Sequence, residues 1–199
     1  MRLNILLIWM GLAVSAANAQ EPTSLDETNQ SSEPQVRFVT NLGAFTIGLD
    51  RTRAPLTVEN FLNYARNGHY QGTIFHRVIQ GFVAQAGGFT PELQEKPTPD
   101  DGTVINESGN GLSNLRGSIG LARGNEPHAG KAQFYINLSD NTDLNPRPTR
   151  WGYAVFGKII EGMEIVDQIG HVPVGASGQF DRDVPLQPII IETVELIND

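Results

Sequence analysis

Short apolar runs separated by glycine and proline are the feature that most limits how this 199-residue chain can fold. Runs of this length, bounded by turn-forming residues, predict strands. We expect strands at residues 36–40, 44–49, 73–79, 82–85, 118–122, 133–138, 153–159 and 189–197. The runs do not alternate with helices, which argues against a parallel α/β sheet. The pattern predicts a mainly β protein, an antiparallel barrel or sandwich with helices packed against it.

Two helices interrupt the strand pattern. In residues 55–67 the apolar side chains recur at i, i+3, i+4 and i+7, which gives a helix one apolar face made of Val58, Phe61, Leu62 and Ala65. Pro55 suits the first turn of such a helix, and Gly68 suits the position just after its end. A second, shorter helix is expected at residues 163–168.

The first 19 residues have the features of a secretory signal peptide. Arg2 supplies a positive charge, residues 5–14 are apolar, and Ala17 and Ala19 form a small-x-small cleavage pattern before Gln20. An uncleaved anchor is the alternative, but the apolar run is shorter than the roughly 20 residues that span a bilayer. We therefore expect an exported protein, periplasmic in a Gram-negative host, that leaves the membrane after cleavage.

Charge separates a linker from a folded domain. Residues 20–35 contain four acidic residues, no basic residue and one aliphatic residue, Leu25, so they predict a flexible acidic linker. Residues 36–199 then form one domain. The whole chain has 14 Lys+Arg against 22 Asp+Glu, a net charge of −8. This balance disfavours binding to nucleic acid or to an anionic membrane.

The sequence lacks the residues and motifs that several classes of reaction require. The chain has no cysteine, which excludes disulfides and thiol catalysis. It has no G-x-S-x-G motif, and residues 124–132 lack the spacing and the hydroxyl of a phosphate-binding loop. No pair of histidines is spaced i, i+4 among His69, His76, His128 and His171. We predict neither a metal site nor a cofactor.

Residues 75–90, FHRVIQGFVAQAGGFT, place an arginine within an apolar strand-turn-strand. Strict alternation puts Phe75, Arg77 and Ile79 on one face, with His76 on the other as a satisfied structural histidine. A guanidinium in apolar surroundings needs acceptors, and Gln85 in the second strand is a candidate. From the pattern alone, a structural arginine that binds nearby carbonyls is the favoured interpretation.

This run resembles the signature of the cyclophilins, the peptidyl-prolyl cis/trans isomerases. Three further motifs resemble the family in the same order: GSIGLA at 117–122, QFYIN at 133–137 and YAVFGK at 153–158. The resemblance covers residues 36–199 and is strongest to the exported bacterial branch. It implies an eight-stranded antiparallel closed barrel capped by two helices. It also implies a monomeric isomerase that acts on proline-containing polypeptides.

The resemblance also implies roles for individual residues. Arg77 matches the catalytic arginine, and Gln85 matches the glutamine that orients it. The matches to the proline pocket are Phe82, Val83, Tyr135, Leu144 and Tyr153, with tyrosine at 135 where phenylalanine is usual. The groove for the residues before proline is matched by Ala122, Arg123, Gly124 and Gln133. Arg123 replaces a common asparagine that acts through its backbone, so we expect the change to be tolerated.

One departure concerns the position usually held by tryptophan, which here is Asp143. In sensitive members that tryptophan donates its indole N–H to cyclosporin, so the resemblance implies weak or no binding of the drug. Trp151 is a candidate to replace the lost aromatic ring. Two other functions stay open: a proline-peptide-binding chaperone module of the same fold with weak catalysis, and a carbohydrate-binding barrel that uses exposed aromatic residues.

Overall fold

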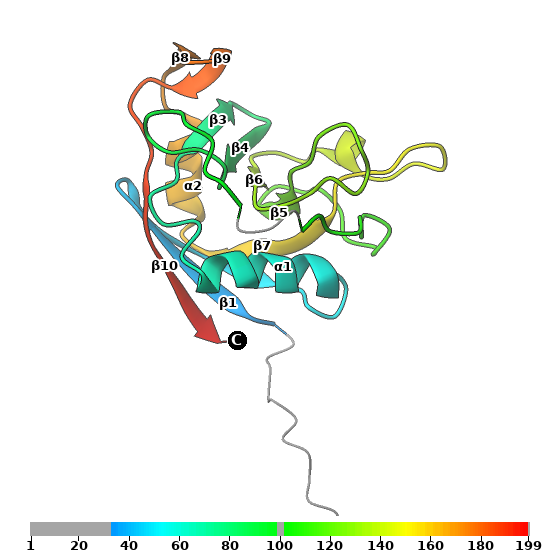
Figure 1. Ribbon diagram of the computed structural model, residues 1–199. Coiled ribbons are helices and arrows are strands. Elements are labelled where there is room, and N and C mark those ends of the chain that lie inside the picture. Colours follow the sequence, from blue (N-terminus) through cyan, green and yellow to red (C-terminus); the bar gives the residue numbers. More distant parts are fainter. Residues whose placement is uncertain (1–32, 99–101, 199) are drawn as a thin grey trace, which may run out of the picture.

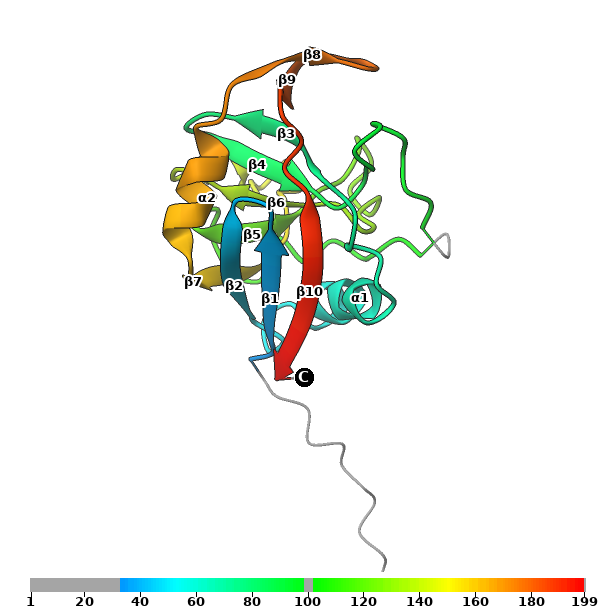
Figure 2. The same cartoon turned by 90° about the vertical axis from the view of Figure 1, so that its left-hand side faces the viewer.

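The computed structural model describes residues 33–98 and 102–198. In this part of the chain, one antiparallel sheet runs in the order β10-β1-β2-β7-β5-β6-β4-β3 (Figures 1 and 2). Its strands are β1 (Gln35–Thr40), β2 (Gly43–Leu49), β3 (Phe75–Ile79), β4 (Val83–Ala86), β5 (Ser118–Leu121), β6 (Phe134–Asn137), β7 (Val155–Glu161) and β10 (Ile191–Asn198). The eight predicted strands are confirmed, with small shifts at their ends. The predicted leader and linker up to residue 32 lie outside the described residues.

The sheet is curled into a half-barrel, so the expectation of a closed barrel is slightly overstated. Its edge strands, β3 and β10, meet only at a bridge between Ile74 and Ile190. Backbone hydrogen bonds from the Phe75 N–H to the Ile189 carbonyl (3.0 Å) and from the Ile191 N–H to the Thr73 carbonyl (2.8 Å) flank it. These contacts precede the two strands, because β10 then turns away to pair with β1. A full ladder between the edges therefore does not form.

The two predicted helices are confirmed as α1 (Pro55–Arg66) and α2 (Met163–Gly170). Helix α1 contacts β10, whereas α2 contacts β2, β3 and β4, so the helices cover different parts of the sheet (Figure 2). The Glu107 carboxylate accepts hydrogen bonds from the Leu56 N–H (3.2 Å) and the Thr57 N–H (2.8 Å). It thus places a negative charge at the start of α1, where the helix dipole favours it. No described helix is long and apolar enough to cross a membrane.

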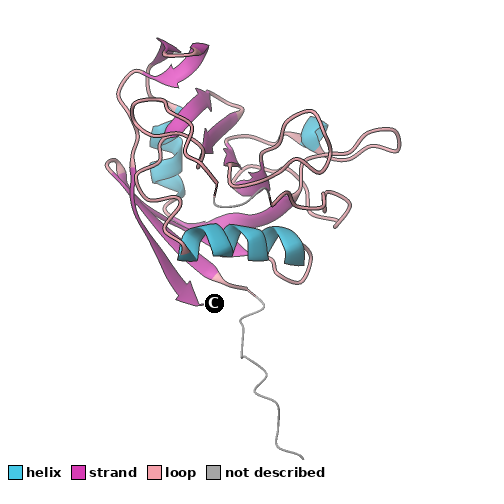
Figure 3. Cartoon of the chain, in the orientation of Figure 1, coloured by secondary structure: helices cyan, strands magenta, loops and turns pink. Residues whose placement is uncertain are grey.

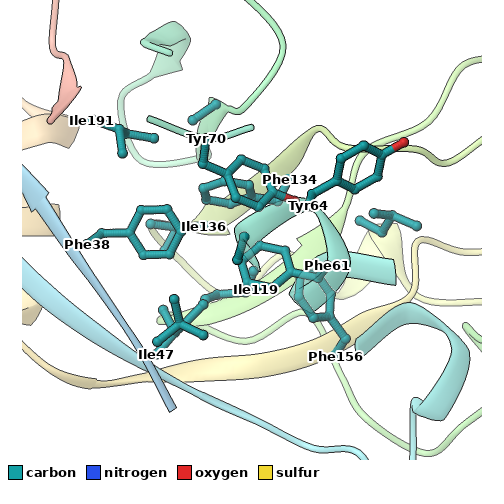
Figure 4. Close-up of a cluster of buried hydrophobic side chains, with 14 of the residues drawn as sticks. Phe38, Ile47, Phe61, Tyr64, Tyr70, Ile119, Phe134, Ile136, Phe156 and Ile191 are labelled. Carbon is teal, nitrogen blue, oxygen red and sulfur yellow. The ribbon is translucent and has the colours of Figure 1, made fainter. Parts of the chain in front are cut away.

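The core fills the inside of the curled sheet (Figure 4). Phe38 of β1 is fully buried, and its ring lies 5.3 Å from Phe45 of β2 and 5.5 Å from Phe134 of β6. Phe61 of α1 closes the cluster, 5.6 Å from Phe134. Aromatic rings at these distances add packing energy to the burial of their area. Since the core occupies the concave side, the outer side of β4 and β6 is left for a binding site.

The sequence pattern missed a second, two-stranded sheet, the hairpin of β8 (Val174–Ser177) and β9 (Phe180–Pro185). It projects at the top of Figure 1. Glycine and alternating charges make these runs resemble a loop in sequence. The hairpin is held by a small apolar cluster of its own, formed by Ile74, Leu93 and Val184 with Phe89, Phe180 and Ile190.

Candidate active site

The outer face of β4 and β6 gathers several of the predicted site residues. Along β4 the two alanines belong to the core, so Val83 and Gln85 lie on the outer face. Along β6, Phe134 belongs to the core as expected, and Tyr135 lies outside it, directly opposite Gln85. Strand alternation in two neighbouring strands therefore sets these side chains beside each other.

A β-bulge in β3 sets the direction of Arg77. Phe75 pairs with Ala86 and Arg77 pairs with Gln85, so His76 is an extra residue in the ladder. Phe75 is fully buried in the core, whereas Arg77 is half-buried. The expectation that Phe75 shares the face of Arg77 is wrong, because the bulge interrupts the two-residue alternation. The same bulge leaves Arg77 directly across from Gln85.

Three side chains form a hydrogen-bonded chain across this face. The Arg77 Nη1 donates to Gln85 Oε1 at 3.3 Å, and the Gln85 Nε2 donates to Gln133 Oε1 at 2.8 Å. The second bond fixes which end of the Gln85 amide faces the arginine. Within the described residues, no carboxylate lies at ion-pair distance from Arg77. Most N–H groups of its guanidinium are thus available to a ligand.

A groove of about 510 Å³ begins at Gln85 and Gln133. It brings together the four residues predicted to hold the peptide before proline: Ala122, Arg123, Gly124 and Gln133. Gly88 also lines it, and a Cβ there would lie 2.5 Å from the Gln133 side chain. A glycine at this position therefore gives Gln133 the room to lie across the floor of the groove.

Direct contacts join three of the residues predicted for the proline pocket: Tyr135, Tyr153 and Leu144. The rings of Tyr135 and Tyr153 meet edge to face at 6.0 Å. The Tyr153 N–H donates to the Leu144 carbonyl at 2.9 Å. Phe82, half-buried, directly precedes the buried Val83 of β4. Burial raises the pKa of Tyr135 well above its ordinary value, so its hydroxyl stays protonated.

Arg123 does more than the expected backbone role. Its guanidinium lies 4.6 Å from the centre of the Tyr153 ring. It donates to the carbonyls of Gly124 (3.0 Å), Trp151 (3.2 Å) and Gly152 (3.3 Å). The side chain therefore joins two loops and lies over the ring of Tyr153, a predicted pocket residue. An asparagine, which is shorter and has one NH₂ group, has fewer donors for these carbonyls.

Asp143 and Trp151 have different partners in the structure. The Asp143 side chain is exposed, and its carboxylate pairs with Arg147 at 2.5 Å. Trp151 packs edge-on against His128 at 5.2 Å and lines a separate hollow of about 440 Å³ with residues 146–150. The lining of that hollow contains none of the residues predicted for the proline pocket. The role of Trp151 as a substitute for the missing tryptophan stays a prediction.

His76 is buried, and its ring packs with the rings of Phe89 (4.5 Å) and Phe180 (5.9 Å), which lie 5.1 Å from each other. Burial lowers its pKa to about 4, so the ring is neutral near pH 7. Its Nδ1 has no hydrogen-bond partner, so the expectation of a fully satisfied histidine is only partly met. Within residues 33–98 and 102–198, no three His, Asp or Glu side chains are arranged to hold a metal ion.

Residues 35–196 match the family model described as "Cyclophilin type peptidyl-prolyl cis-trans isomerase/CLD". The chain belongs to the cyclophilin family. It is 47% identical over 165 residues to the peptidyl-prolyl cis-trans isomerase cyp18 of Streptomyces antibioticus, covering 81% of this chain and 98% of that protein. It is 46% identical over 162 residues to isomerase B of Escherichia coli, covering 80% and 97%.

Solved cyclophilin structures agree in fold. A cyclophilin-type isomerase of Cryptosporidium parvum superposes with a TM-score of 0.67 at 26% identity, covering 84% of this chain and 99% of that one. A second structure of that protein, determined in the presence of the dipeptide Ala-Pro, gives a TM-score of 0.66 at 27% identity, covering 83% and 99%. Family membership assigns peptidyl-prolyl cis-trans isomerase activity to the chain.

Some residues of this cyclophilin's groove were not predicted from its sequence. The groove is also lined by His69, Gly87, Gly88, Glu95, Lys96, Pro97, Thr98, Ala129, Lys131 and Ala132. The paired glycines at 87 and 88, directly after β4, were the one local signal available, since close approach of a backbone often requires glycine. The lysines gave no such signal, because no local pattern distinguishes a lysine that lines a groove from one on an exposed loop.

Proposed function

We propose that this cyclophilin accelerates rotation about X-Pro bonds during the folding of exported proteins, and that Arg77 stabilises the twisted amide. The observation that carries the proposal is the hydrogen-bonded chain from Arg77 through Gln85 to Gln133, at the junction of the groove and the aromatic pocket residues. The chain orients one glutamine toward the arginine and leaves the remaining guanidinium donors for a substrate.

Catalysis of this rotation requires one hydrogen-bond donor that is directed at the proline nitrogen. The planar X-Pro bond is held by donation of the nitrogen lone pair into the carbonyl, with a barrier of about 18–20 kcal/mol. In the twisted transition state the lone pair is localised on nitrogen, so a donor aimed there binds the transition state more strongly than the ground state. Arginine suits this task because it stays charged and holds its donors in a rigid fork.

The different residues at the two ends of this face indicate the direction in which the substrate peptide binds. In our proposal the residues before proline lie in the groove beside Ala122, Gly124 and Gln133, and the proline ring lies against the aromatic and aliphatic pocket residues. The pocket residues are Phe82, Val83, Tyr135, Leu144 and Tyr153. With the ring held, the chain before proline turns past Arg77. The crystal of the Cryptosporidium relative with Ala-Pro supports a proline peptide as the ligand class.

Export is supported by the sequence of the first 19 residues. We propose a periplasmic monomer in which the acidic linker of residues 20–35 separates the cleaved leader from the domain. Expression of the full chain in a Gram-negative host, followed by osmotic-shock fractionation, tests this. A periplasmic protein whose intact mass begins at Gln20 supports the proposal, and a cytoplasmic protein that retains Met1 contradicts it.

A protease-coupled isomerisation assay on residues 20–199 tests the activity itself. Wild type, Arg77→Ala and a control, Arg37→Ala, are compared, because Arg37 is exposed on β1 at the far side of the sheet. Turnover by wild type and the control but not by Arg77→Ala supports the proposal. Tight binding of a proline peptide without turnover contradicts it and favours the peptide-binding chaperone module.

A further inference from the structure

Asn114, in the loop before β5, is a fully buried polar side chain whose polar groups all have partners. Its N–H and its Nδ2 both donate to Asn145 Oδ1, at 2.9 and 3.0 Å. Its carbonyl accepts from the Asn141 N–H at 2.7 Å. Its Oδ1 accepts from the Tyr135 hydroxyl at 2.6 Å and from Asn137 Nδ2 at 3.2 Å. Because this one buried residue bonds to four others, we infer that it holds the segments that carry them together.

Two of these partners bracket a single helical turn. The short 3-10 helix Thr142–Leu144 begins directly after Asn141 and ends directly before Asn145. Asn114 thus holds the residues on both sides of the turn that carries Leu144. Asn114 and the bond from the Tyr153 N–H to the Leu144 carbonyl therefore both hold the position of Leu144.

The Tyr135 hydroxyl connects this turn to the opposite wall of the proposed proline pocket. Tyr135 lies in β6, and its ring meets that of Tyr153, whose N–H is bonded to the Leu144 carbonyl. A phenylalanine would fill the same space but would leave Asn114 Oδ1 with Asn137 as its one partner. The hydroxyl therefore fixes the distance between two walls that come from separate parts of the chain.

The network continues to the residue that precedes β4. Asn141 Nδ2 donates to the Phe82 carbonyl at 2.8 Å and to Asn137 Oδ1 at 2.8 Å. Asn137 in turn donates to Ser118 Oγ at 2.8 Å. Phe82, Tyr135 and Leu144 are thereby linked through buried or half-buried amides, whereas the side chains of Arg77 and Gln85 take no part in it.

We propose that Asn114 is the positioning residue of the proline pocket, which sets the separation of Leu144 from Tyr135. The inference rests on the proposed function, since it assigns the proline ring to this pocket. It separates two properties: the Asn114 network controls how well proline is held, and the Arg77–Gln85 pair controls how fast the bond turns. Loosening the network should therefore raise KM and leave kcat nearly unchanged.

Three variants loosen the network to different degrees. Asn145→Ala removes the acceptor of two bonds from a half-buried position, Tyr135→Phe removes one hydroxyl, and Asn114→Ala removes the centre. Asn110→Ala is the matched control: Asn110 lies in the same loop, bonds the Val155 carbonyl (2.9 Å) and the Leu112 N–H (3.0 Å), and has no bond to the pocket network. Thermal unfolding of each variant shows whether it folds.

The measurements are kcat and KM for a proline peptide, and the Kd of the same peptide from NMR titration. We expect KM and Kd to rise about fivefold in Asn145→Ala and about threefold in Tyr135→Phe, because a net hydrogen bond changes affinity by a factor of this order. We expect kcat to stay within about twofold, and Asn110→Ala to match wild type in both constants.

A double-mutant cycle separates positioning from general support. In a Leu144→Ala background, Asn145→Ala should change KM by less than about 1.5-fold, because the side chain that it positions is gone. An equal KM effect in both backgrounds, or a fall in kcat without a rise in KM, overturns the inference. If wild type binds the peptide without turnover, the proposed function fails, and the Kd values alone still decide the inference.

Discussion

In each half of the active face an arginine lies among the predicted site residues, and the two arginines are bound in opposite ways. The strand half consists of Arg77, Gln85 and Gln133, carried by β3, β4 and the start of β6. The loop half consists of the loop residues 112–117, 122–129 and 141–153, together with Tyr135, whose hydroxyl bonds to Asn114 in the first of these loops. Figure 3 shows the long loops on the side of the sheet where β5 and β6 lie. Arg77 bonds a single glutamine, whereas Arg123 donates to several backbone carbonyls and covers Tyr153. The first guanidinium is free to act on a substrate, and the second is used to hold loops.

Exchanging each arginine for alanine should give opposite results, and this is the largest effect that we expect. Arg77→Ala should lower kcat/KM by about 10²-fold, as loss of one donor to a developing charge costs about 2.7–4 kcal/mol, with little change in Tm. Arg123→Ala should lower kcat/KM far less. It should destabilise the fold by about 2 kcal/mol, which lowers Tm by about 4–8 °C.

Coupled assays and thermal unfolding of both variants decide the comparison. If Arg77→Ala unfolds early and Arg123→Ala loses turnover at an unchanged Tm, the assignment of the two arginines is reversed.

The same division explains what could be predicted from the sequence. The partners in the strand half follow from two-residue alternation and from the short turn between β3 and β4, so Gln85 was identified as the acceptor for Arg77. The bulge at His76 was not foreseen, because an extra residue in a ladder depends on the partner strand. Asn114 in the loop half was missed, since its bond to Asn145 joins residues 31 apart and no local pattern marks it.

His76 provides a test of stability in the strand half. Its pKa in the folded protein is about 4, below the ordinary 6.5 of an unfolded chain, because burial disfavours the charged ring. Between these two values the unfolded state binds more protons, so stability falls as pH drops from 6.5 to 4. The full contribution is about 3 kcal/mol, at about 1.36 kcal/mol for each pH unit of the shift.

Urea unfolding at pH 7 and pH 4 measures this contribution. We expect the loss of stability between the two pH values to be smaller by about 3 kcal/mol in His76→Gln, which cannot gain the proton. His171→Gln, at an exposed position just after α2, is the control. An identical loss in wild type and His76→Gln would show that another group governs acid unfolding.

Asp143 tests the loop half through cyclosporin, and here we expect a smaller effect. An ionised carboxylate has no donor, and its burial under a drug is costly, whereas a tryptophan offers an N–H and apolar area. A lost hydrogen bond of about 1–3 kcal/mol corresponds to roughly tenfold or more in affinity. We therefore expect Asp143→Trp to lower the inhibitory concentration at least about tenfold while proline turnover persists.

A titration of both proteins with cyclosporin, beside Arg147→Ala, makes the test specific. Arg147→Ala frees the Asp143 carboxylate from its ion pair but adds no ring, so it should stay as insensitive as wild type. Inhibition of wild type by nanomolar drug would mean that another residue of the loop half supplies the missing contact.

The smallest expected effect is an almost flat pH profile of kcat/KM between about pH 6 and 8. In the strand half, arginine does not titrate in this range, and His76 with a pKa of about 4 is already neutral. In the loop half, burial raises the pKa of Tyr135, so its hydroxyl keeps donating to Asn114 throughout.

Profiles of kcat/KM against pH for wild type, His76→Gln and His128→Gln locate any pH dependence that is found. A bell-shaped curve that disappears in His76→Gln would assign proton transfer to the strand half. One that disappears in His128→Gln would place a titrating group in the loop half, where His128 packs against Trp151.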